Sequence, residues 1–192
     1  MTTTGIVVFE NAEELDFVGP WEVFGMAAKL REQGDRVLLL AEDDGPVRCA
    51  KGLRVLPDAT FAQAPALDVV LVPGGQGTRR EVNNPAMLGF LRAQKPQWMT
   101  SVCTGSLVLH GSGHARGKRV TTHWNFVQTL RERGEVTVLD DQRWVRDGNL
   151  VTAAGVSAGI DMSLWLVGEM WGVEFARKVQ KAIEYFPQPP YG

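Results

Sequence analysis

The sharpest chemical signal in the sequence is the segment TSVCTG, Thr100–Gly105, which contains one of the chain's 2 cysteines. A short apolar run, predicted to be a strand, leads directly into Cys103, and a helix is expected to begin immediately afterwards. A side chain on such a tight strand-to-helix turn is pushed outward, as in nucleophile elbows. The unpaired N–H groups and the positive dipole of a helix N-terminus favour a thiolate over a thiol. The segment therefore predicts a nucleophilic Cys103; the alternative is a small buried hydrophobic residue, the usual fate of free cysteine.

Two other segments could supply the groups that such a nucleophile needs. The apolar run Val69–Val72 ends in Pro73-Gly74-Gly75, where glycine lets the backbone turn an N–H into a site as an oxyanion donor. Asp16, in EELDFVGP, comes just before the first amphipathic stretch and could hydrogen-bond the sulfur of Cys103. A carboxylic acid beside a thiolate holds its proton more tightly, which suits a proton donor. The alternatives are an ordinary glycine-rich turn and a helix N-cap.

The remaining motifs lack a partner that their chemistry requires. The run Gly155–Gly159 matches a serine-hydrolase elbow, but that triad needs a histidine after the serine, and His123 is the last histidine. We interpret Ser157 as a helix cap or as a residue in the wall of the site. His110 and His114 are spaced like metal ligands, but the glycines around them interrupt the helix that would align them. No metal site is therefore expected.

Composition and charge narrow the class of protein. The 192 residues carry 20 Lys and Arg against 22 Asp and Glu, which gives a formal net charge of −2. This balance argues against a general affinity for nucleic acid or for anionic membranes. Met1–Thr4 does not start a signal peptide, and the apolar runs are shorter than a membrane span. Gly75-Gln76-Gly77 lacks the third glycine of a dinucleotide fingerprint, so no cofactor is expected. We therefore expect one reduced, cytoplasmic domain over residues 1–192.

Short apolar runs alternate with amphipathic stretches, which indicates an α/β protein with a mainly parallel sheet. The predicted buried strands are Ile6–Phe9, Val37–Ala41, Val69–Val72 and Trp98–Val102. The predicted helices are a stretch around Phe17–Ala28, then Pro85–Ala93, a helix beginning near Cys103, Ser157–Met170 and Val173–Tyr185. Two β-branched stretches with turn signals, Val47–Leu56 and Val136–Val151, are predicted to be hairpin additions. Ligands bind at the carboxyl ends of such strands, where Cys103 is placed.

Several blocks together resemble the ThiJ/PfpI superfamily, whose fold is class I glutamine-amidotransferase-like: LDFVGPWEVF, VPGG, TSVCTGSLVL, GKRVTTHW and the ending EYFPQPP. The resemblance covers about residues 5–190 and is strongest to the isocyanide hydratase branch. It implies a flavodoxin-like three-layer sandwich with helices on both faces, and a homodimer. It also implies Cys103 as nucleophile, Asp16 as its acidic partner, and the backbone N–H groups of Gly75 and Thr104 as oxyanion donors. His123, Trp124 and Ser157 are the candidates for lining the site.

The function implied by this resemblance is the hydration of a small-molecule isocyanide to an N-substituted formamide through a cysteine thioimidate. Thr104 stands where the protease-like members have histidine, which argues against a peptidase. The same blocks occur in the ligand-side domain of AraC-type regulators, but this chain shows no helix-turn-helix segment, so no nucleic-acid partner is expected. Two alternatives stay open: a glyoxalase-type lyase acting on α-oxoaldehydes, and a non-catalytic sensor in which Cys103 is oxidised or binds a ligand.

Overall fold

A computed structural model describes residues 1–191 and places a seven-stranded sheet at the centre of the fold. The strand order is β10-β11-β7-β6-β1-β2-β5, and all neighbours are parallel except the hairpin β10–β11. The strands are β1 (Thr3–Val7), β2 (Arg36–Ala41), β5 (Ala59–Thr60), β6 (Val69–Val72), β7 (Trp98–Val102), β10 (Trp144–Asp147) and β11 (Leu150–Ala153). The mainly parallel sheet predicted from the sequence is confirmed.

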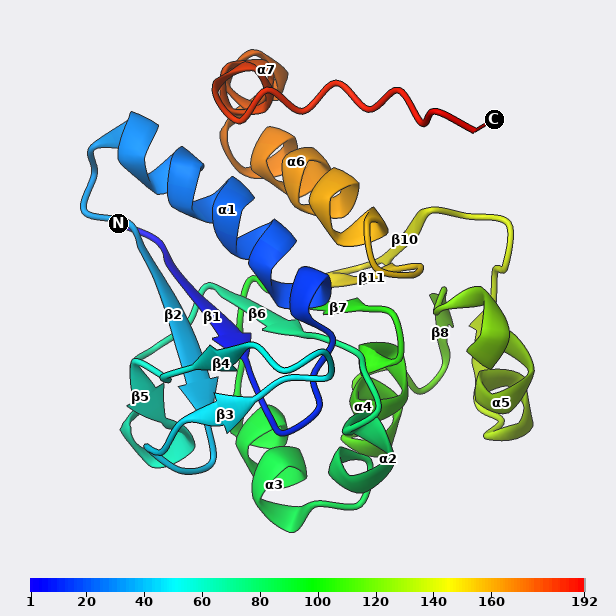
Figure 1. The fold of residues 1–192 in the computed structure, drawn as a ribbon. Helices are drawn as coiled ribbons and strands as arrows, with labels where there is room; N and C mark the ends of the chain where they lie inside the picture. Colours follow the sequence, from blue (N-terminus) through cyan, green and yellow to red (C-terminus); the bar gives the residue numbers. More distant parts are fainter. Residues whose placement is uncertain (192) are drawn as a thin grey trace.

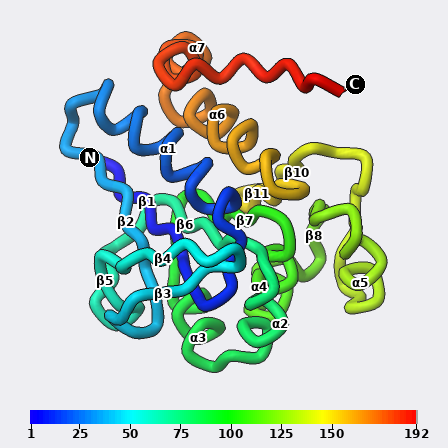
Figure 2. Tube along the Cα trace, in the orientation of Figure 1, coloured from blue at the N-terminus to red at the C-terminus, as the bar shows by residue number. Residues whose placement is uncertain are grey.

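Helices cover both faces of the sheet, which confirms the three-layer arrangement (Figure 1). One face carries α1 (Glu14–Arg31) and α6 (Ala158–Trp171), with α7 (Val173–Ala182) packed outside them. The other carries α3 (Pro85–Ala93), α4 (Gly105–Gly111) and the short α2 (Thr78–Glu81). Beyond α7 the chain turns back and runs alongside α6 (Figure 2). No helix within residues 1–191 is long and apolar enough to cross a membrane.

Local sequence explains the elements that frame the carboxyl ends of the strands. The strand β6 reads VVLV, and all four residues are buried, as expected for a strand covered on both faces. The helix α3 begins with proline at its first position, and the side chain of Asn84 accepts a hydrogen bond from the N–H of Ala86. The helix α1 has acidic residues in its first turn and basic residues in its last, in keeping with the helix dipole.

One of the two predicted hairpin additions is correct, and the other is correct only in part. The stretch Val47–Leu56 forms the antiparallel pair β3 (Val47–Arg48) and β4 (Arg54–Val55). In the stretch Val136–Val151, however, β9 (Val136–Val138) pairs in parallel with β8 (Lys118–Val120) in a separate small sheet. The remainder forms the hairpin β10–β11 at the edge of the main sheet, and all four residues of β11 are buried. Its burial, like that of β6, is what a strand inside the main sheet requires.

Candidate active site

Cys103 lies on a tight turn between β7, which ends at Val102, and α4, which begins at Gly105. Its φ is +56°, a left-handed conformation that is rare for residues other than glycine and that recurs at functional turns. The N–H of Cys103 donates to the carbonyl of Ala153 (3.1 Å) and to that of Ala154 (2.7 Å), both after or at the end of β11. Its side chain is 7% exposed, so the sulfur lies just below the surface. The predicted elbow is therefore present.

Asp16 lies in the first turn of α1 and is completely buried. It is not the N-cap, which is Glu13, so the capping alternative is wrong. Oδ2 accepts a hydrogen bond of 2.8 Å from the N–H of Gly74, while Oδ1 is buried with no hydrogen-bond partner among residues 1–191. The thiol of Cys103 is close enough to Asp16 to lower the pKa of its carboxyl by hydrogen bonding. The structure therefore brings together the two residues predicted to form the reactive pair.

Burial raises the pKa of both members of this pair. It raises the pKa of Asp16 to about 7, against the hydrogen bond from Gly74, which lowers it. Burial, together with the charge of Asp16, raises the pKa of Cys103 to about 12. Hydrogen bonds from Thr104 and from the backbone N–H of Val156 lower the pKa of the thiol but do not offset the burial. The raised pKa of Asp16 is the direction expected for a proton donor. The expectation of a free thiolate at Cys103 is wrong, because burial of the sulfur raises the thiol pKa more than the N-terminus of the seven-residue helix α4 lowers it. Between the two pKa values the pair holds one proton.

The Pro73-Gly74-Gly75 turn packs directly against the pair. A Cβ atom added to Gly74 would lie 2.8 Å from Oδ2 of Asp16 and 2.6 Å from the backbone nitrogen of Thr104, so only glycine fits there. The N–H of Gly75 donates to Oγ1 of Thr104 (3.1 Å), which also accepts a hydrogen bond from Oγ1 of Thr78 (3.1 Å). The predicted role of Gly75 as a free oxyanion donor therefore needs correction: its N–H fixes the hydroxyl of Thr104 instead.

Two contributors to the site were missed in the sequence. Oγ1 of Thr122 donates to the carbonyl of Cys103 (3.0 Å), which ties the segment after β8 to the elbow. Hydrogen bonding from the backbone N–H of Val156 lowers the pKa of the Cys103 thiol. Thr122 lies within the TTHW block and could have been singled out from that block. Val156 could not be identified from the sequence, because its position depends on a left-handed φ of +41°, which a β-branched residue rarely adopts.

A cavity of about 450 Å³ lies beside the elbow and is lined by His123, Trp124 and Ala154–Val156, among others. His123 packs on Gly155, where a Cβ atom would lie 2.5 Å from its Cδ2. Nδ1 of His123 accepts the N–H of Asn125 (3.2 Å), and burial lowers the pKa of the imidazole. Trp124 is 76% exposed at this cavity and is not a core residue. Neither Cys103 nor Asp16 is among the residues that line this cavity, so His123 and Trp124 line a space next to the elbow and their part in the site stays a prediction.

Ser157 is exposed and lies at the N-cap position of α6, but its side chain makes no capping hydrogen bond. Its Oγ accepts a hydrogen bond of 3.2 Å from Nη2 of Arg143. Ser157 lines a neighbouring cavity of about 870 Å³ between α6, α7 and β10, rather than the cavity beside the elbow. Arg143 lines both cavities and forms part of the wall between them.

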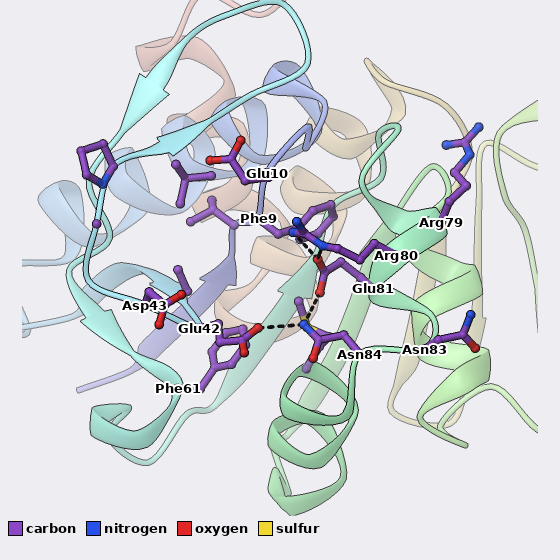
Figure 3. A pocket seen from close by; sticks show the side chains of 16 residues that line it. Phe9, Glu10, Glu42, Asp43, Phe61, Arg79, Arg80, Glu81, Asn83 and Asn84 are labelled. Carbon is purple, nitrogen blue, oxygen red and sulfur yellow. Dashed lines mark hydrogen bonds and ion pairs between the residues drawn. The ribbon is translucent and has the colours of Figure 1, made fainter.

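A third cavity, of about 800 Å³, lies at the carboxyl ends of β1 and β2 and contains neither Cys103 nor Asp16 (Figure 3). Its polar groups bind one another: Nδ2 of Asn84 donates to Glu42 and to Glu81, at 2.8 Å each. Arg80 forms an ion pair of 2.5 Å with the buried Glu81. Over residues 1–191 no three His, Cys, Asp or Glu side chains are grouped as a metal ion would require.

Comparisons with known proteins identify the family. Residues 4–169 match the DJ-1/PfpI family. The chain is 42% identical to isonitrile hydratase of Pseudomonas putida over 97% of its own length and 80% of the relative, and 28% identical to protein DJ-1alpha of Drosophila melanogaster over 96% and 84%. The crystal structure of a ThiJ/PfpI family protein from Pseudomonas syringae superposes with a TM-score of 0.91 at 33% identity, covering 100% of this chain and 78% of that one. The chain therefore belongs to the DJ-1/PfpI family.

Proposed function

We propose that this protein is an isocyanide hydratase, which adds water to R–NC and releases R–NH–CHO. The observation that carries the proposal is the burial of Asp16 beside Cys103, which raises the pKa of both groups. The similarity to isonitrile hydratase, another name for the same activity, supports the choice of substrate. The reaction needs one nucleophile and one group that both takes and gives a proton, and the pair supplies both.

In the first step the sulfur of Cys103 attacks the terminal carbon of the isocyanide. The carboxylate of Asp16 takes the proton of the thiol and delivers it to the same carbon, which becomes more electrophilic as it is protonated. The product is the thioimidate R–N=CH–S–Cys103, and Asp16 is again a carboxylate. No external proton is consumed, which explains why a protonated thiol beside a carboxylate is a competent starting state. The N–H groups of Thr104 and Val156 stabilise the negative charge that develops on the sulfur.

In the second step water adds across the C=N bond of the thioimidate. Asp16 takes a proton from the water as its oxygen bonds to carbon, and gives that proton to the nitrogen. The tetrahedral intermediate is R–NH–CH(OH)–S–Cys103. Breaking the C–S bond releases the formamide, and the hydroxyl proton returns to the sulfur through Asp16. One carboxyl group therefore serves as base and acid in turn.

The test is to incubate the purified protein with an aryl isocyanide and to follow the loss of substrate absorbance and the appearance of the formamide. Cys103→Ala must abolish turnover, and full activity in that variant would end the proposal. Methylglyoxal, offered in parallel, tests the glyoxalase alternative. The sensor alternative requires that Cys103 be oxidised reversibly. Intact mass after mild peroxide treatment measures that oxidation directly.

We also propose that the protein forms a homodimer through α1. Leu15, Val18 and Trp21 are 38%, 37% and 43% exposed. Their spacing of three residues places these apolar side chains on one face of the helix. Exposed apolar surface of this kind marks an interaction site. A second copy of the chain, as the resemblance implies, would cover this face, which lies on the helix that carries Asp16.

A further inference from the structure

We propose that Arg79 is a positioning residue for the cavity beside the elbow, because its guanidinium joins the segment His123–Phe126, which carries Trp124, to the Pro73-Gly74-Gly75 turn. The reaction proposed above gives this arginine no role. The inference rests on that proposed function, since it concerns where the enzyme would hold the substituent of an isocyanide. Arg79 acts on the substrate only through the segment that it holds.

Arg79 contacts both segments with one guanidinium group. Its Nη1 donates a hydrogen bond of 2.9 Å to the carbonyl of Gly75. Its Cζ lies over the ring of Phe126, 4.5 Å from the ring centroid, which is cation–π geometry. A planar guanidinium can donate in its plane while its face stacks on an aromatic ring, which an ammonium cannot do. The neighbouring Arg80 cannot replace it, because the two side chains leave α2 in different directions and Arg80 pairs with Glu81 (Figure 3).

The turn that receives this hydrogen bond is fixed by other contacts. The carbonyl of Gly75 also accepts a hydrogen bond of 2.8 Å from Oγ1 of Thr78, and the N–H of Gly75 donates to Oγ1 of Thr104 (3.1 Å). The N–H of Gly74 donates to Oδ2 of Asp16 (2.8 Å). Loss of the arginine leaves these bonds in place, so the reactive pair should keep its geometry.

The segment on the other side of the guanidinium is anchored to the site at its beginning. Just before the segment, Oγ1 of Thr122 donates to the carbonyl of Cys103 (3.0 Å). The ring of His123 then packs on Gly155, where a Cβ atom would lie 2.5 Å from Cδ2 of the imidazole. Three residues later, Phe126 meets the guanidinium. The arginine therefore holds the end of the segment, and these contacts hold its beginning.

The end of the segment has no hydrogen bond of its own to the site. The N–H of Asn125 donates to Nδ1 of His123 (3.2 Å), and the N–H of Phe126 donates to the carbonyl of His123 (2.8 Å). In the part of the chain that the structure describes, no hydrogen bond joins His123–Phe126 to Cys103, Thr104 or the Pro73-Gly74-Gly75 turn. Without the arginine, the end of the segment is less restrained, and the exposed indole of Trp124 moves with it.

The first experiment measures hydrogen exchange by mass spectrometry in peptides that cover residues 121–130. Arg79→Ala should speed exchange in this segment about 2- to 5-fold, the size of an exposed cation–π contact. Phe126→Leu should have the same effect, and the double variant should add little to either, because both changes remove one contact. Arg79→Lys should restore part of the protection.

The chain offers a matched control in Arg116, another exposed arginine, which pairs with Glu135 at 3.4 Å and not with the segment. Arg116→Ala should leave exchange in residues 121–130 unchanged. Unchanged exchange in Arg79→Ala, an equal rise in both arginine variants, or fully additive effects of Arg79→Ala and Phe126→Leu would each overturn the attachment. This readout needs no isocyanide, so it is decided separately from the proposed hydratase activity.

The second experiment compares KM with kcat for an aryl isocyanide. Arg79→Ala should raise KM about 2- to 5-fold and leave kcat nearly unchanged, because the reactive pair keeps its contacts while the wall of the cavity loosens. KM for a small alkyl isocyanide should change less. Faster exchange without a change in KM would overturn the positioning role. A parent protein without turnover would refute the hydratase and this role together, but not the attachment seen by exchange.

Discussion

The carboxyl of Asp16 lies against the thiol of Cys103 in a site that is almost closed to water, and burial raises the pKa of both groups. With a pKa of about 7 for the carboxyl and about 12 for the thiol, the two groups together hold one proton at any pH between these values. Proton transfer between them requires no exchange with solvent. The pair is therefore set up for reactions in which a nucleophile and its proton end on the same substrate.

Replacing the carboxyl should separate thiol reactivity from turnover. Asp16→Asn keeps an oxygen that can accept the N–H of Gly74 but removes the group that carries the proton. We expect turnover of an aryl isocyanide to fall at least ~10²-fold, as is typical when a general acid–base group is lost. Alkylation of Cys103 should become faster, because the negative charge that raises the thiol pKa is gone. A parallel fall in both rates would contradict the assigned role.

The pH dependence of kcat/KM should show a single rise through about pH 7. Below this value Asp16 is protonated in the free enzyme and cannot take the thiol proton. Above it the pair holds one proton, and activity should stay level until the thiol itself titrates near pH 12. Steady-state rates between pH 5 and 9 measure this profile. A bell centred on pH 7 would indicate a second titrating group.

Ionisation of the buried Asp16 carboxyl should lower the free energy of unfolding at neutral and alkaline pH. The folded-state pKa of Asp16 is raised from 3.8 to about 7, so its contribution to stability is complete below pH 4 and is lost as the pH rises through 7. Asp16→Asn cannot ionise, and should be more stable than the parent chain at pH 8 by up to about 4 kcal/mol. The difference should shrink toward pH 4. Urea unfolding at the two pH values measures it, and a destabilised variant at pH 8 would contradict the raised pKa.

The exposed indole of Trp124 should select for flat apolar substituents on the substrate, since it lines the cavity beside the elbow together with His123. Trp124→Ala should raise KM for an aryl isocyanide about 2- to 10-fold, the size of one aromatic contact. KM for a small alkyl isocyanide should change less. Trp124→Phe is the matched control, because it keeps an aromatic face. Equal effects on both substrates would remove Trp124 from substrate selection.

The apolar face of α1 should control the oligomeric state. Trp21→Glu places a charge at the most exposed residue of the Leu15, Val18 and Trp21 face and should yield monomers. Leu30→Glu is the control, because Leu30 is 45% exposed on the same helix but lies on the opposite side of the helix axis from Trp21 and further toward the end of the helix. Light scattering after size-exclusion chromatography measures the mass. A parent chain that is already monomeric would refute the dimer.

The sequence predicted the bounds of those helices and strands that are set by residues within them or next to them in the chain. The strands Val69–Val72 and Trp98–Val102 and the helix Pro85–Ala93 have the predicted bounds. Each is marked by residues within it or next to it: an apolar run between turn residues, or proline at a first helical position. The pairing of Val136–Val138 with Lys118–Val120 was not predictable in this way, because a parallel partner is chosen by the tertiary fold.

The candidate site was predictable in its membership but not in its electrostatics. Cys103 and Asp16 were identified from their motifs, and the structure brings them together. The direction of the thiol pKa was wrong because loss of hydration, which depends on every segment packed around the sulfur, outweighs the helix end. The donor assigned to Gly75 was wrong because its N–H is already used by Thr104. The homodimer and the cytoplasmic location stay predictions.

Cys103 follows β7, and only the strands β11 and β10 lie between β7 and one edge of the sheet. The strand β11 pairs with β7 on one side and with the edge strand β10 on the other. The carbonyls that accept the N–H of Cys103 are those of Ala153, the last residue of β11, and of Ala154, which follows it. Local unfolding at the edge of a sheet costs much less free energy than global unfolding. If β10 detaches, only β11 remains between the solvent-exposed edge and the turn that carries the sulfur of Cys103. Heating should inactivate the protein before its helices melt.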